Sequence, residues 1–381
     1  MVRAVPLMGA LTLALATAAA QPQRPFTVAD GIAMTTLVDA EGDALGSSSA
    51  MPGAFSWSPD GSRVLLVTRR ASVVTGTNTF SLLAFSAAEL ATFVRGGEQL
   101  PLPRARQLAA FEISRPRTHQ GGIASVRWVG NDVVAFIGRR EDGLGQVYRY
   151  DLKNGALQQL TRHPEDIVEF DLSLKSAKLL FASYVTPDWT ERNRRGYAVT
   201  SEPINYLVTK DPDDAFKDLA YYAADLDTGR VQSVSSSAGF PQMPTPIALS
   251  PSGRWAVILT RVENVPDHWL QYAVIAQERR KSAVARSQSL DSDWYGGGTQ
   301  EPWRLQFALV DMEAREVRPL LDAPVTLEPS ITRAIWSDDE KSVVFGATML
   351  PLKDASSGEL AARARCQRWS RWRSPPAACG A

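Results

Sequence analysis

A short pattern recurs five times along the chain, and no other feature constrains the fold as strongly. Each copy contains an apolar anchor residue near its start. A tight turn follows the anchor, and a short run of strand-forming residues follows the turn. The copies are FSWSPDGSRVLLVTRR from Phe55, SVRWVGNDVVAFIGRR from Ser125, EFDLSLKSAKLLFASY from Glu169, IALSPSGRWAVILTR from Ile247 and AIWSDDEKSVVFGAT from Ala334. Such recurrence predicts a repeat architecture, in which neighbouring copies bury each other's apolar faces.

The turns and the runs that follow them have a conformational explanation. In Ser58-Pro59-Asp60-Gly61 proline occupies the second position and glycine the fourth, and Ser250-Pro251-Ser252-Gly253 repeats this arrangement. Both suit a type I turn. The runs at 64–67 and 133–137 are continuously apolar, which indicates strands covered on both faces.

A second recurring element is a hairpin with alternating apolar and polar residues. Its copies are YRYDLKNGALQQLT from Tyr148, YYAADLDTGRVQSV from Tyr221 and FALVDMEAREVRPLL from Phe307. One turn-plus-strand element and one hairpin make about four strands, which is a β-propeller blade. We therefore predict an all-β fold, a β-propeller of about seven four-stranded blades, with six or eight as alternatives. The apolar runs are expected to line its channel, and an all-β sandwich is the less favoured fold.

The spacing of the anchors indicates where the blades are interrupted. Consecutive anchors are 71, 44, 77 and 87 residues apart, against about 40–45 residues per blade in a common propeller repeat. The anchors are Trp57, Trp128, Leu172, Leu249 and Trp336. The long intervals contain either a second, degenerate blade or an insertion. Insertions are favoured near 185–220 and 262–303, since each lies between a turn-plus-strand element and its hairpin. The propeller is expected over 55–350, after a linker or first strand at 21–54.

The first 20 residues have the features of a secretory signal peptide. Arg3 precedes an apolar stretch that ends in Ala18-Ala19-Ala20, an A-x-A-like cleavage site. A membrane anchor is the alternative, but Pro6 and Gly9 interrupt the stretch, which is shorter than the ~20 residues of a spanning helix. We expect export to the periplasm or beyond, and no membrane span.

The residues that usually carry chemistry form no recognisable catalytic or metal motif. No G-x-S-x-G is present; the nearest string, from Gly46 to Ala50, ends in alanine, and His119, His163 and His268 are isolated in the sequence. With two cysteines and no His/Cys pair, we expect no catalytic residue, metal or cofactor. The chain has 41 basic and 41 acidic residues, so a nucleic-acid partner is not expected.

Arginines follow the apolar runs at matching positions of the repeats. A propeller would gather them at one rim, where guanidinium groups could bind a peptide carboxylate or acidic side chain through paired hydrogen bonds. The alternative is a set of solvated charges that pair locally, for example with Glu141 and Asp142. The candidate substrate-binding residues at these positions are Arg69, Arg70, Arg139, Arg140 and Arg261.

The insertion at 187–214 is rich in aromatic residues and arginine, the residue types that dominate binding hot spots. It is expected either to form a recognition surface or to pack as a loop on the neighbouring blade. Its candidate substrate-binding residues are Arg194, Arg195 and Tyr197.

These residues resemble the N-terminal propeller of the prolyl oligopeptidase-like serine peptidases, and more narrowly the lasso peptide isopeptidases. The broad likeness rests on the Ser-Pro-Asp-Gly and Asp-Leu-x-x-Gly elements between about residue 50 and residue 348. The narrow likeness rests on three strings: Arg69-Arg70-Ala71, Asn78-Thr79-x-x-Leu82-Leu83 and Arg194-Arg195-Gly196-Tyr197.

The resemblance implies a full-length enzyme with a C-terminal α/β-hydrolase domain, which carries a Ser/Asp/His triad and cleaves the isopeptide bond of a lasso-type peptide. That domain is not found in this sequence, so no catalytic residue is carried over and the chain is predicted to be inactive alone. The alternative is a stand-alone Tol-like periplasmic propeller that binds a protein or peptide.

The end of the chain differs in composition from the repeats. Residues 351–381 are expected to form an aberrant, disordered tail, because the part after Glu359 holds five Arg, two Trp and both Cys but no acid. A reading-frame shift explains this composition, and a natural basic tail is the alternative. Translation of the DNA in the other frames distinguishes the two: a further hairpin followed by G-x-S-x-G would support the peptidase interpretation.

Overall fold

The computed structural model describes residues 25–38, 55–96, 101–114, 121–140, 143–185, 219–237, 239–241, 244–262, 264–273, 275–276, 305–325, 332–353 and 355–365. The helical segments in this part of the chain are short: α1 (Val28–Ala33), α2 (Ala87–Gly96), the 3₁₀ segment η2 (Asp267–Gln271) and α6 (Ser357–Arg365). None of the described helices has the length and apolar character needed to cross a membrane.

The strands form five antiparallel sheets, which we number 1 to 5 along the chain. Sheet 1 contains β1 (Thr35–Val38), β2 (Ser56–Trp57), β3 (Arg63–Ser72), β4 (Thr77–Ser86) and β5 (Arg106–Ile113). Sheet 2 contains β6 (Ile123–Trp128), β7 (Val133–Arg139), β8 (Gly145–Asp151) and β9 (Ala156–Gln159). Sheet 3 contains β10 (Ile167–Ser173), β11 (Lys178–Tyr184), β12 (Leu219–Asp225) and β13 (Val231–Ser233). Sheet 4 contains β14 (Ala248–Leu249), β15 (Trp255–Arg261), β16 (Leu305–Asp311) and β17 (Glu316–Pro324), and sheet 5 contains β18 (Arg333–Trp336) and β19 (Val343–Gly346).

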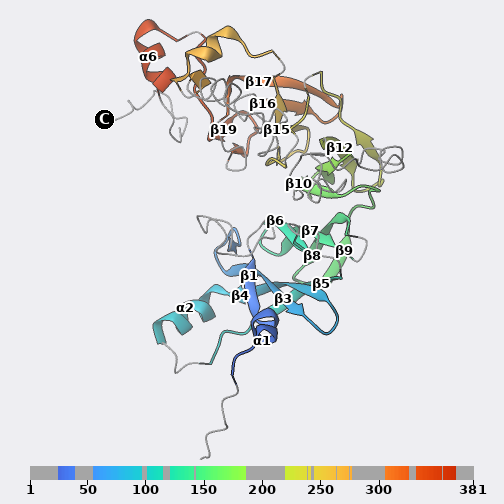
Figure 1. The fold of residues 1–381 in the computed structure, drawn as a ribbon. Helices are drawn as coiled ribbons and strands as arrows, with labels where there is room; N and C mark the ends of the chain where they lie inside the picture. The colour runs from blue at the N-terminus through green and yellow to red at the C-terminus, as the bar shows by residue number, and fades with distance from the viewer. Residues whose placement is uncertain are drawn as a thin grey trace, which may run out of the picture.

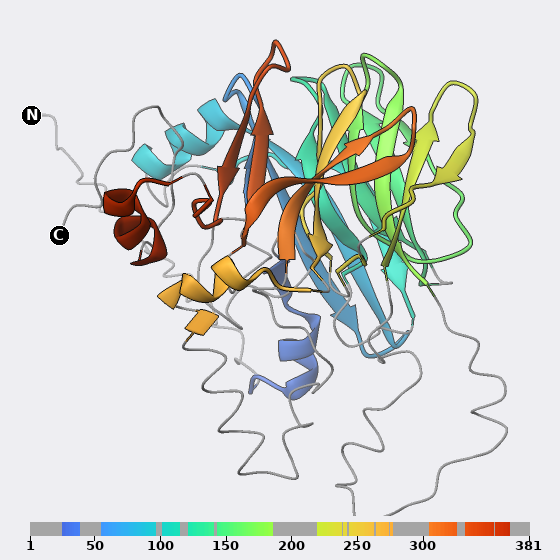
Figure 2. The same ribbon diagram turned by 90° about the horizontal axis from the view of Figure 1, so that it is seen from above.

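The sheets are arranged as consecutive blades of a propeller. In sheets 2, 3 and 4 the four strands pair in chain order, and in sheet 1 both β1 and β2 pair with the same edge of β3. The first strands of neighbouring sheets contact each other, β2 with β6, β10 with β14 and β14 with β18. Figure 1 shows the sheets following one another along an arc, from sheet 1 in blue to sheet 5 in red, and Figure 2 shows the same succession from above. The prediction of an all-β propeller is confirmed.

The predicted turns form as the sequence indicates. The N–H of Gly61 donates to the carbonyl of Ser58 at 2.8 Å, and that of Gly253 donates to Ser250 at 2.8 Å. Both glycines have φ near +70°, a conformation that side-chain-bearing residues adopt only at a cost. The Ser58 hydroxyl also accepts from the N–H of Arg63 at 2.9 Å, so the serine joins the turn to the strand that follows it.

The described part of the chain contains five sheets, and the total number of about seven blades stays a prediction. In two of the long intervals between anchors, the described strands before and after the connection belong to the same sheet. As predicted, two insertions separate second and third strands, β11 from β12 and β15 from β16, and α2 lengthens sheet 1 between β4 and β5.

The apolar runs occupy a different place from the one expected. They form β3, β7, β11 and β15, each the second strand of its sheet with hydrogen-bonded strands on both sides. The short strands before the turns, not these runs, lie at the inner edges where neighbouring sheets meet. Two paired edges and two covered faces explain the continuous apolar sequence: Val134, Ala135, Phe136 and Ile137 are fully buried.

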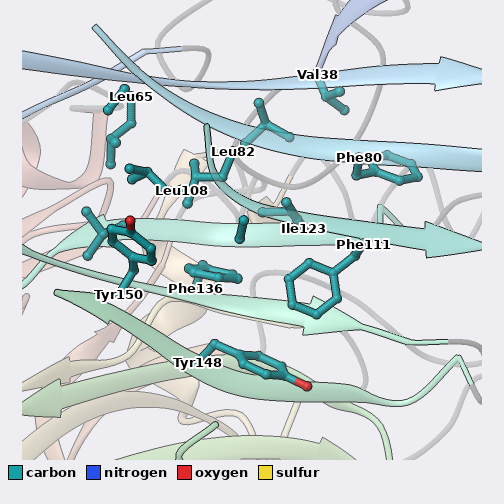
Figure 3. Packing of buried hydrophobic residues seen from close by; sticks show 14 of the residues in the cluster. Val38, Leu65, Phe80, Leu82, Leu108, Phe111, Ile123, Phe136, Tyr148 and Tyr150 are labelled. Carbon is teal, nitrogen blue, oxygen red and sulfur yellow. The ribbon is translucent and has the colours of Figure 1, made fainter. Parts of the chain in front are cut away.

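Each pair of neighbouring sheets encloses its own apolar core. Figure 3 shows the core between sheets 1 and 2, where Phe80 and Phe111 of sheet 1 lie beside Phe136 and Tyr148 of sheet 2. The Phe111 ring meets Phe136 edge-on at a centroid distance of 6.0 Å. Close approach requires glycine here, because a Cβ at Gly138 would lie 2.6 Å from the Phe111 ring. Similar cores join the later sheets.

The segment expected to be a disordered tail contains a packed helix. Glu359 accepts hydrogen bonds from the Ser356 N–H at 3.0 Å and from its hydroxyl at 2.7 Å, a capping arrangement at the start of α6. Leu360 packs against a cluster that includes Trp269 and Tyr272 of the insertion after β15. The expected disorder therefore does not apply to 355–365, while 366–381 and both cysteines lie outside the described residues.

Candidate recognition rim

The connections between second and third strands all leave the propeller at one side, which we call the insertion rim. The described chain reaches this rim in the hairpin at 73–76 and at the ends of β7, β11 and β15. These connections share one side because every sheet has the same strand direction and the sheets succeed one another as blades. The turns between first and second strands lie at the opposite side. Loops gathered on a rigid scaffold are where binding residues are usually found.

Three of the candidate arginines occupy one repeat position at this rim. Arg69, Arg139 and Arg261 each come five residues after the residue that pairs with the anchor of their sheet. Strand alternation turns each of them toward the following sheet, as it does Leu65 and Val67 in sheet 1. The sequence therefore predicted correctly that these positions correspond.

Arg139 is engaged inside the protein rather than exposed at the rim. It is only 4% exposed, and its Nε lies 3.4 Å from Asp166 Oδ1. Its guanidinium also donates to the carbonyl of Gly121 at 2.9 Å, and Asp166 accepts from the Gly145 N–H at 2.6 Å. This buried pair joins sheets 2 and 3, and it differs from both sequence-based alternatives, an exposed binding group and a solvated charge paired with Glu141 or Asp142.

Arg69 lacks the acidic partner that Arg139 has. The position of Asp166 in sheet 3 corresponds to Gly122 in sheet 2, six residues before the anchor in both sheets. Phe80, the cross-strand partner of Arg69, lies so close to Gly122 that a Cβ there would be 2.6 Å from its ring. No side chain fits at that point, so sheet 2 offers Arg69 no carboxylate there.

The remaining candidates differ in how far the structure describes them. Arg70 and Arg140 are exposed, and Arg140 lies 5.8 Å from the centre of the Tyr148 ring. Arg261 is half-buried, and its main-chain N–H donates to Gly239 at 2.7 Å. Among the described residues, none of these three guanidinium groups has an ion-pair partner. The candidates Arg194, Arg195 and Tyr197 lie outside the described residues, as do Glu141 and Asp142.

The two histidines in the described part of the chain, His163 and His268, make packing and hydrogen-bond contacts near this rim. His163 packs between Phe181 and Tyr222 at 5.2 and 4.5 Å, and burial lowers its pKa. His268, isolated in the sequence, lies 3.1 Å from Asp322. Asp322 also accepts from the Trp269 indole at 3.0 Å, so the contact holds the insertion after β15 against β17.

A polar cluster at the inner edges was not predicted from the sequence. Arg127 of β6 forms ion pairs with Glu169 and Asp171 of β10, the latter at 3.3 Å, and its guanidinium lies 4.5 Å from the Phe170 ring centre. Asp171 accepts in turn from the Leu249 N–H of sheet 4 at 2.8 Å. Burial raises the pKa of Asp171 although Arg127 acts against it. The sequence held one signal: Arg127 and Asp171 are opposite charges at the same position of consecutive repeats.

The fold resembles several solved structures at low sequence identity. The chain matches the apo AtxE2 isopeptidase at 18% identity with a TM-score of 0.38, covering 64% of this chain and 37% of that chain. It matches TolB from Acinetobacter baumannii at 15% with a TM-score of 0.36, covering 72% and 47%. It matches the acylaminoacyl peptidase from Pyrococcus horikoshii at 10% with a TM-score of 0.41, covering 83% and 36%.

The likeness to these structures concerns the fold alone. The chain spans less than half the length of each of the three proteins. The isopeptidase and the acylaminoacyl peptidase belong to the β-propeller peptidase group that the sequence resembles. No protein-family model and no curated protein matches the sequence.

Proposed function

We propose that this chain is the propeller part of an exported prolyl oligopeptidase-like serine peptidase of the lasso peptide isopeptidase kind, and that its insertion rim binds the peptide substrate. The full-length enzyme would transfer the acyl group of an amide to a serine and then to water, with an oxyanion hole stabilising the intermediate. The propeller would contribute recognition and no reacting group.

One observation carries the proposal: Arg69 occupies the repeat position of Arg139 but faces Gly122 where Arg139 faces Asp166. A half-buried guanidinium that has no carboxylate opposite it at Gly122 and no ion-pair partner among the described residues favours a carboxylate from outside the chain, bound through two parallel hydrogen bonds. Arg69 also lies in the Arg69-Arg70-Ala71 string on which the resemblance to the isopeptidases rests. Peptide termini and acidic side chains both provide such a group.

Further contacts are proposed around Arg69. Arg70 lies beside it, and Arg140 and Arg261 follow second strands at the same rim. The insertion that leaves sheet 3 after β11 contains Arg194, Arg195 and Tyr197, which we propose as additional contacts. Several guanidinium groups at one rim favour an acidic peptide and raise its association rate at low salt.

The proposal is tested by binding of a fluorescently labelled lasso-type peptide that ends in a free carboxylate, with its amidated analogue for comparison. We expect the carboxylate form to bind and Arg69→Ala to weaken it about 10- to 100-fold, because charge-assisted hydrogen bonds contribute about 1.5–3 kcal/mol. Arg69→Lys should restore binding only in part, since lysine lacks the planar pair of donors.

A control variant distinguishes specific recognition by Arg69 from a general effect of positive charge, and an assay for cleaved peptide tests whether the chain has catalytic activity. Arg95 lies on α2 and hydrogen-bonds within its own helix, so Arg95→Ala should leave binding unchanged. The same samples should release no cleaved peptide. Equal binding of the amidated peptide would assign the site to acidic side chains rather than to the peptide terminus. Undiminished binding to Arg69→Ala would refute a carboxylate site at Arg69, and amide hydrolysis by the chain alone would refute the assigned role.

A further inference from the structure

Exposed apolar side chains gather where sheet 1 reaches the insertion rim. Six of the seventeen large apolar residues that are exposed in the described part of the chain lie there, in two short segments. Single exposed apolar residues are normal on a protein surface, whereas a gathered set marks a binding surface. We call this set the apolar patch, and its members are Phe26, Val28, Ile32, Met34, Val73 and Val74.

The pairing of β1 with β3 brings the two segments of the apolar patch together. Thr35 lies opposite Arg70, so α1, which comes just before β1, lies beyond Arg70 at the rim. α1 contacts β3, and Figure 2 shows α1 beside the end of the β3–β4 hairpin. The hairpin tip carries Val73 and Val74. The patch is therefore one surface built from α1 and this tip.

The helix in the patch is held by its own hydrogen bonds. The main-chain N–H of Thr27 donates to Asp30 Oδ2 at 2.8 Å, and the N–H of Asp30 donates to the Thr27 hydroxyl at 3.2 Å. The Phe26 ring lies against the helix, since a Cβ at Gly31 would be 3.5 Å from it. None of the helical residues is buried, so α1 is fixed in place while its apolar side chains remain open to a ligand.

Strand alternation places Met34 of the patch on the same face of sheet 1 as Arg69. Val38 and Val67 lie opposite each other and point into the core between sheets 1 and 2. Arg69 is two residues beyond Val67, so it faces the same way. Met34 is four residues before Val38 in extended backbone, which puts it on this face as well. It is 56% exposed.

A ligand for this face combines a carboxylate with nearby apolar groups. The β1–β3 register places Thr36 opposite Arg69, so Met34 lies two residues further along the sheet, about 7 Å at the rise of a strand. The same distance spans about two residues of an extended peptide. The geometry thus fits a peptide whose apolar residues are next to its carboxylate.

A bilayer is the other partner that an exposed apolar surface can have. It would contact the hairpin tip first, because Val74 is 92% exposed. Arg69 is half-buried, and a narrow extended chain reaches such a group more readily than a flat surface does. The nearness of a recessed guanidinium to the apolar patch therefore favours a peptide.

We propose that the peptide bound at Arg69 has large apolar side chains at the two residues next to its carboxylate, and that the apolar patch selects for them. This inference rests on the proposed function and adds the class of peptide to it. Met34 and Val73 are the proposed specificity-determining residues, since they are the members of the patch nearest to Arg69 along β1 and β3.

The test compares two labelled peptides that share a free terminal carboxylate and differ at the two residues before it, leucine in one and serine in the other. The parent chain should bind the leucine peptide at least about 10-fold more tightly, because burial of a leucine side chain contributes about that factor. The double variant Met34→Ser/Val73→Ser should bind both peptides equally. Both residues are exposed, so these substitutions disturb no core.

Val94→Ser is the matched control. This valine is 78% exposed on α2, which follows β4 at the side opposite the rim, so the variant should keep the preference for leucine. Arg69→Ala should weaken binding of both peptides by the same factor, because they share the carboxylate. The effect of Arg69 and the effect of the patch are thereby measured separately.

The outcomes distinguish this inference from the proposed function. Equal affinity of the parent chain for both peptides, still dependent on Arg69, would overturn the apolar selection and leave the carboxylate site in place. Binding of neither peptide would refute the proposed function and this inference with it. A preference that survives the double variant would overturn the role of the patch. Sedimentation of the parent chain, but not of the double variant, with phosphatidylglycerol vesicles would assign the patch to a membrane and overturn the proposal.

Discussion

At the scale of single residues, the fourth position of the turns at 58–61, 250–253 and 337–340 has the most restricted backbone conformation. Its φ is +68° at Gly61, +71° at Gly253 and +58° at Glu340. The left-handed conformation thus persists where the residue is not glycine. The hydrogen bonds of the turn and the strands on either side therefore impose this conformation. Glycine lowers its conformational free energy, because it has no Cβ.

The two turn glycines differ in what surrounds them, which gives a matched test. A Cβ at Gly61 would meet nothing within 4 Å, whereas a Cβ at Gly253 would lie 2.3 Å from Ser176 Oγ and 2.8 Å from Lys178 Cβ. We expect Gly61→Ala to lower the free energy of unfolding by about 1 kcal/mol, for left-handed strain alone. Gly253→Ala should lower it by about 3 kcal/mol, because overpacking adds to the strain. Urea unfolding measures both, and equal losses would contradict the close contact.

At the scale of elements, the inner strands are cross-linked by charge as well as by apolar packing. Arg127 joins β6 to β10 through Glu169 and Asp171, and Asp171 joins β10 to β14 through the Leu249 N–H. Three consecutive sheets therefore share one polar network. Removing the cation leaves two neighbouring carboxylates without their counter-charge, which is more costly than losing an exposed pair.

Arg127→Ala tests the strength of this network. We expect the free energy of unfolding to fall by about 3 kcal/mol, at the lower end for a buried ion pair because the three side chains remain partly exposed. Arg254→Ala is the control, since its pair with Glu313 spans 3.6 Å between exposed side chains and should contribute less than about 1 kcal/mol. Adding Glu169→Gln to Arg127→Ala should recover part of the loss. Similar losses for both arginines would exclude a shared network.

At the scale of the whole molecule, each sheet contacts its neighbours along the chain, so stability accumulates from one interface to the next. Carboxylates at the turns add a contribution to this stability that depends on pH. Hydrogen bonds from Ser58 and Ser62 lower the pKa of Asp60 to about 2, and hydrogen bonds from Lys178 and Thr228 hold the pKa of Asp225 well below its ordinary value.

These lowered values predict how stability responds to acid. An unfolded aspartate has a pKa of about 3.9, so the stabilisation is complete above about pH 4 and is lost as the pH falls through the folded-state value. We expect the free energy of unfolding to decline between about pH 4 and pH 2. Asp225→Asn should flatten this decline, because the variant lacks the carboxylate whose pKa the fold lowers. An unaltered slope in Asp225→Asn would show that these bonds do not stabilise the fold.

The sequence predicted more of the elements than of the site. It identified the turns, the hairpins, the two insertions and the matching positions of Arg69, Arg139 and Arg261. It did not predict that Asp166 neutralises Arg139 while Gly122 leaves Arg69 without a carboxylate, because those neighbours belong to the next sheet. It also missed α6, although Ser356 and Glu359 have the spacing of a capping box.

The sequence by itself determined the fold class, because turn chemistry and apolar runs depend on residues only a few positions apart. The tertiary structure alone decided that the apolar runs are second strands and that the described residues form five sheets. It alone also decided that the side chains of Trp57 and Ile335 are exposed to solvent. The physical reason is that burial of a face depends on the sheet packed against it. That sheet lies tens of residues away in the chain, beyond the reach of any local pattern.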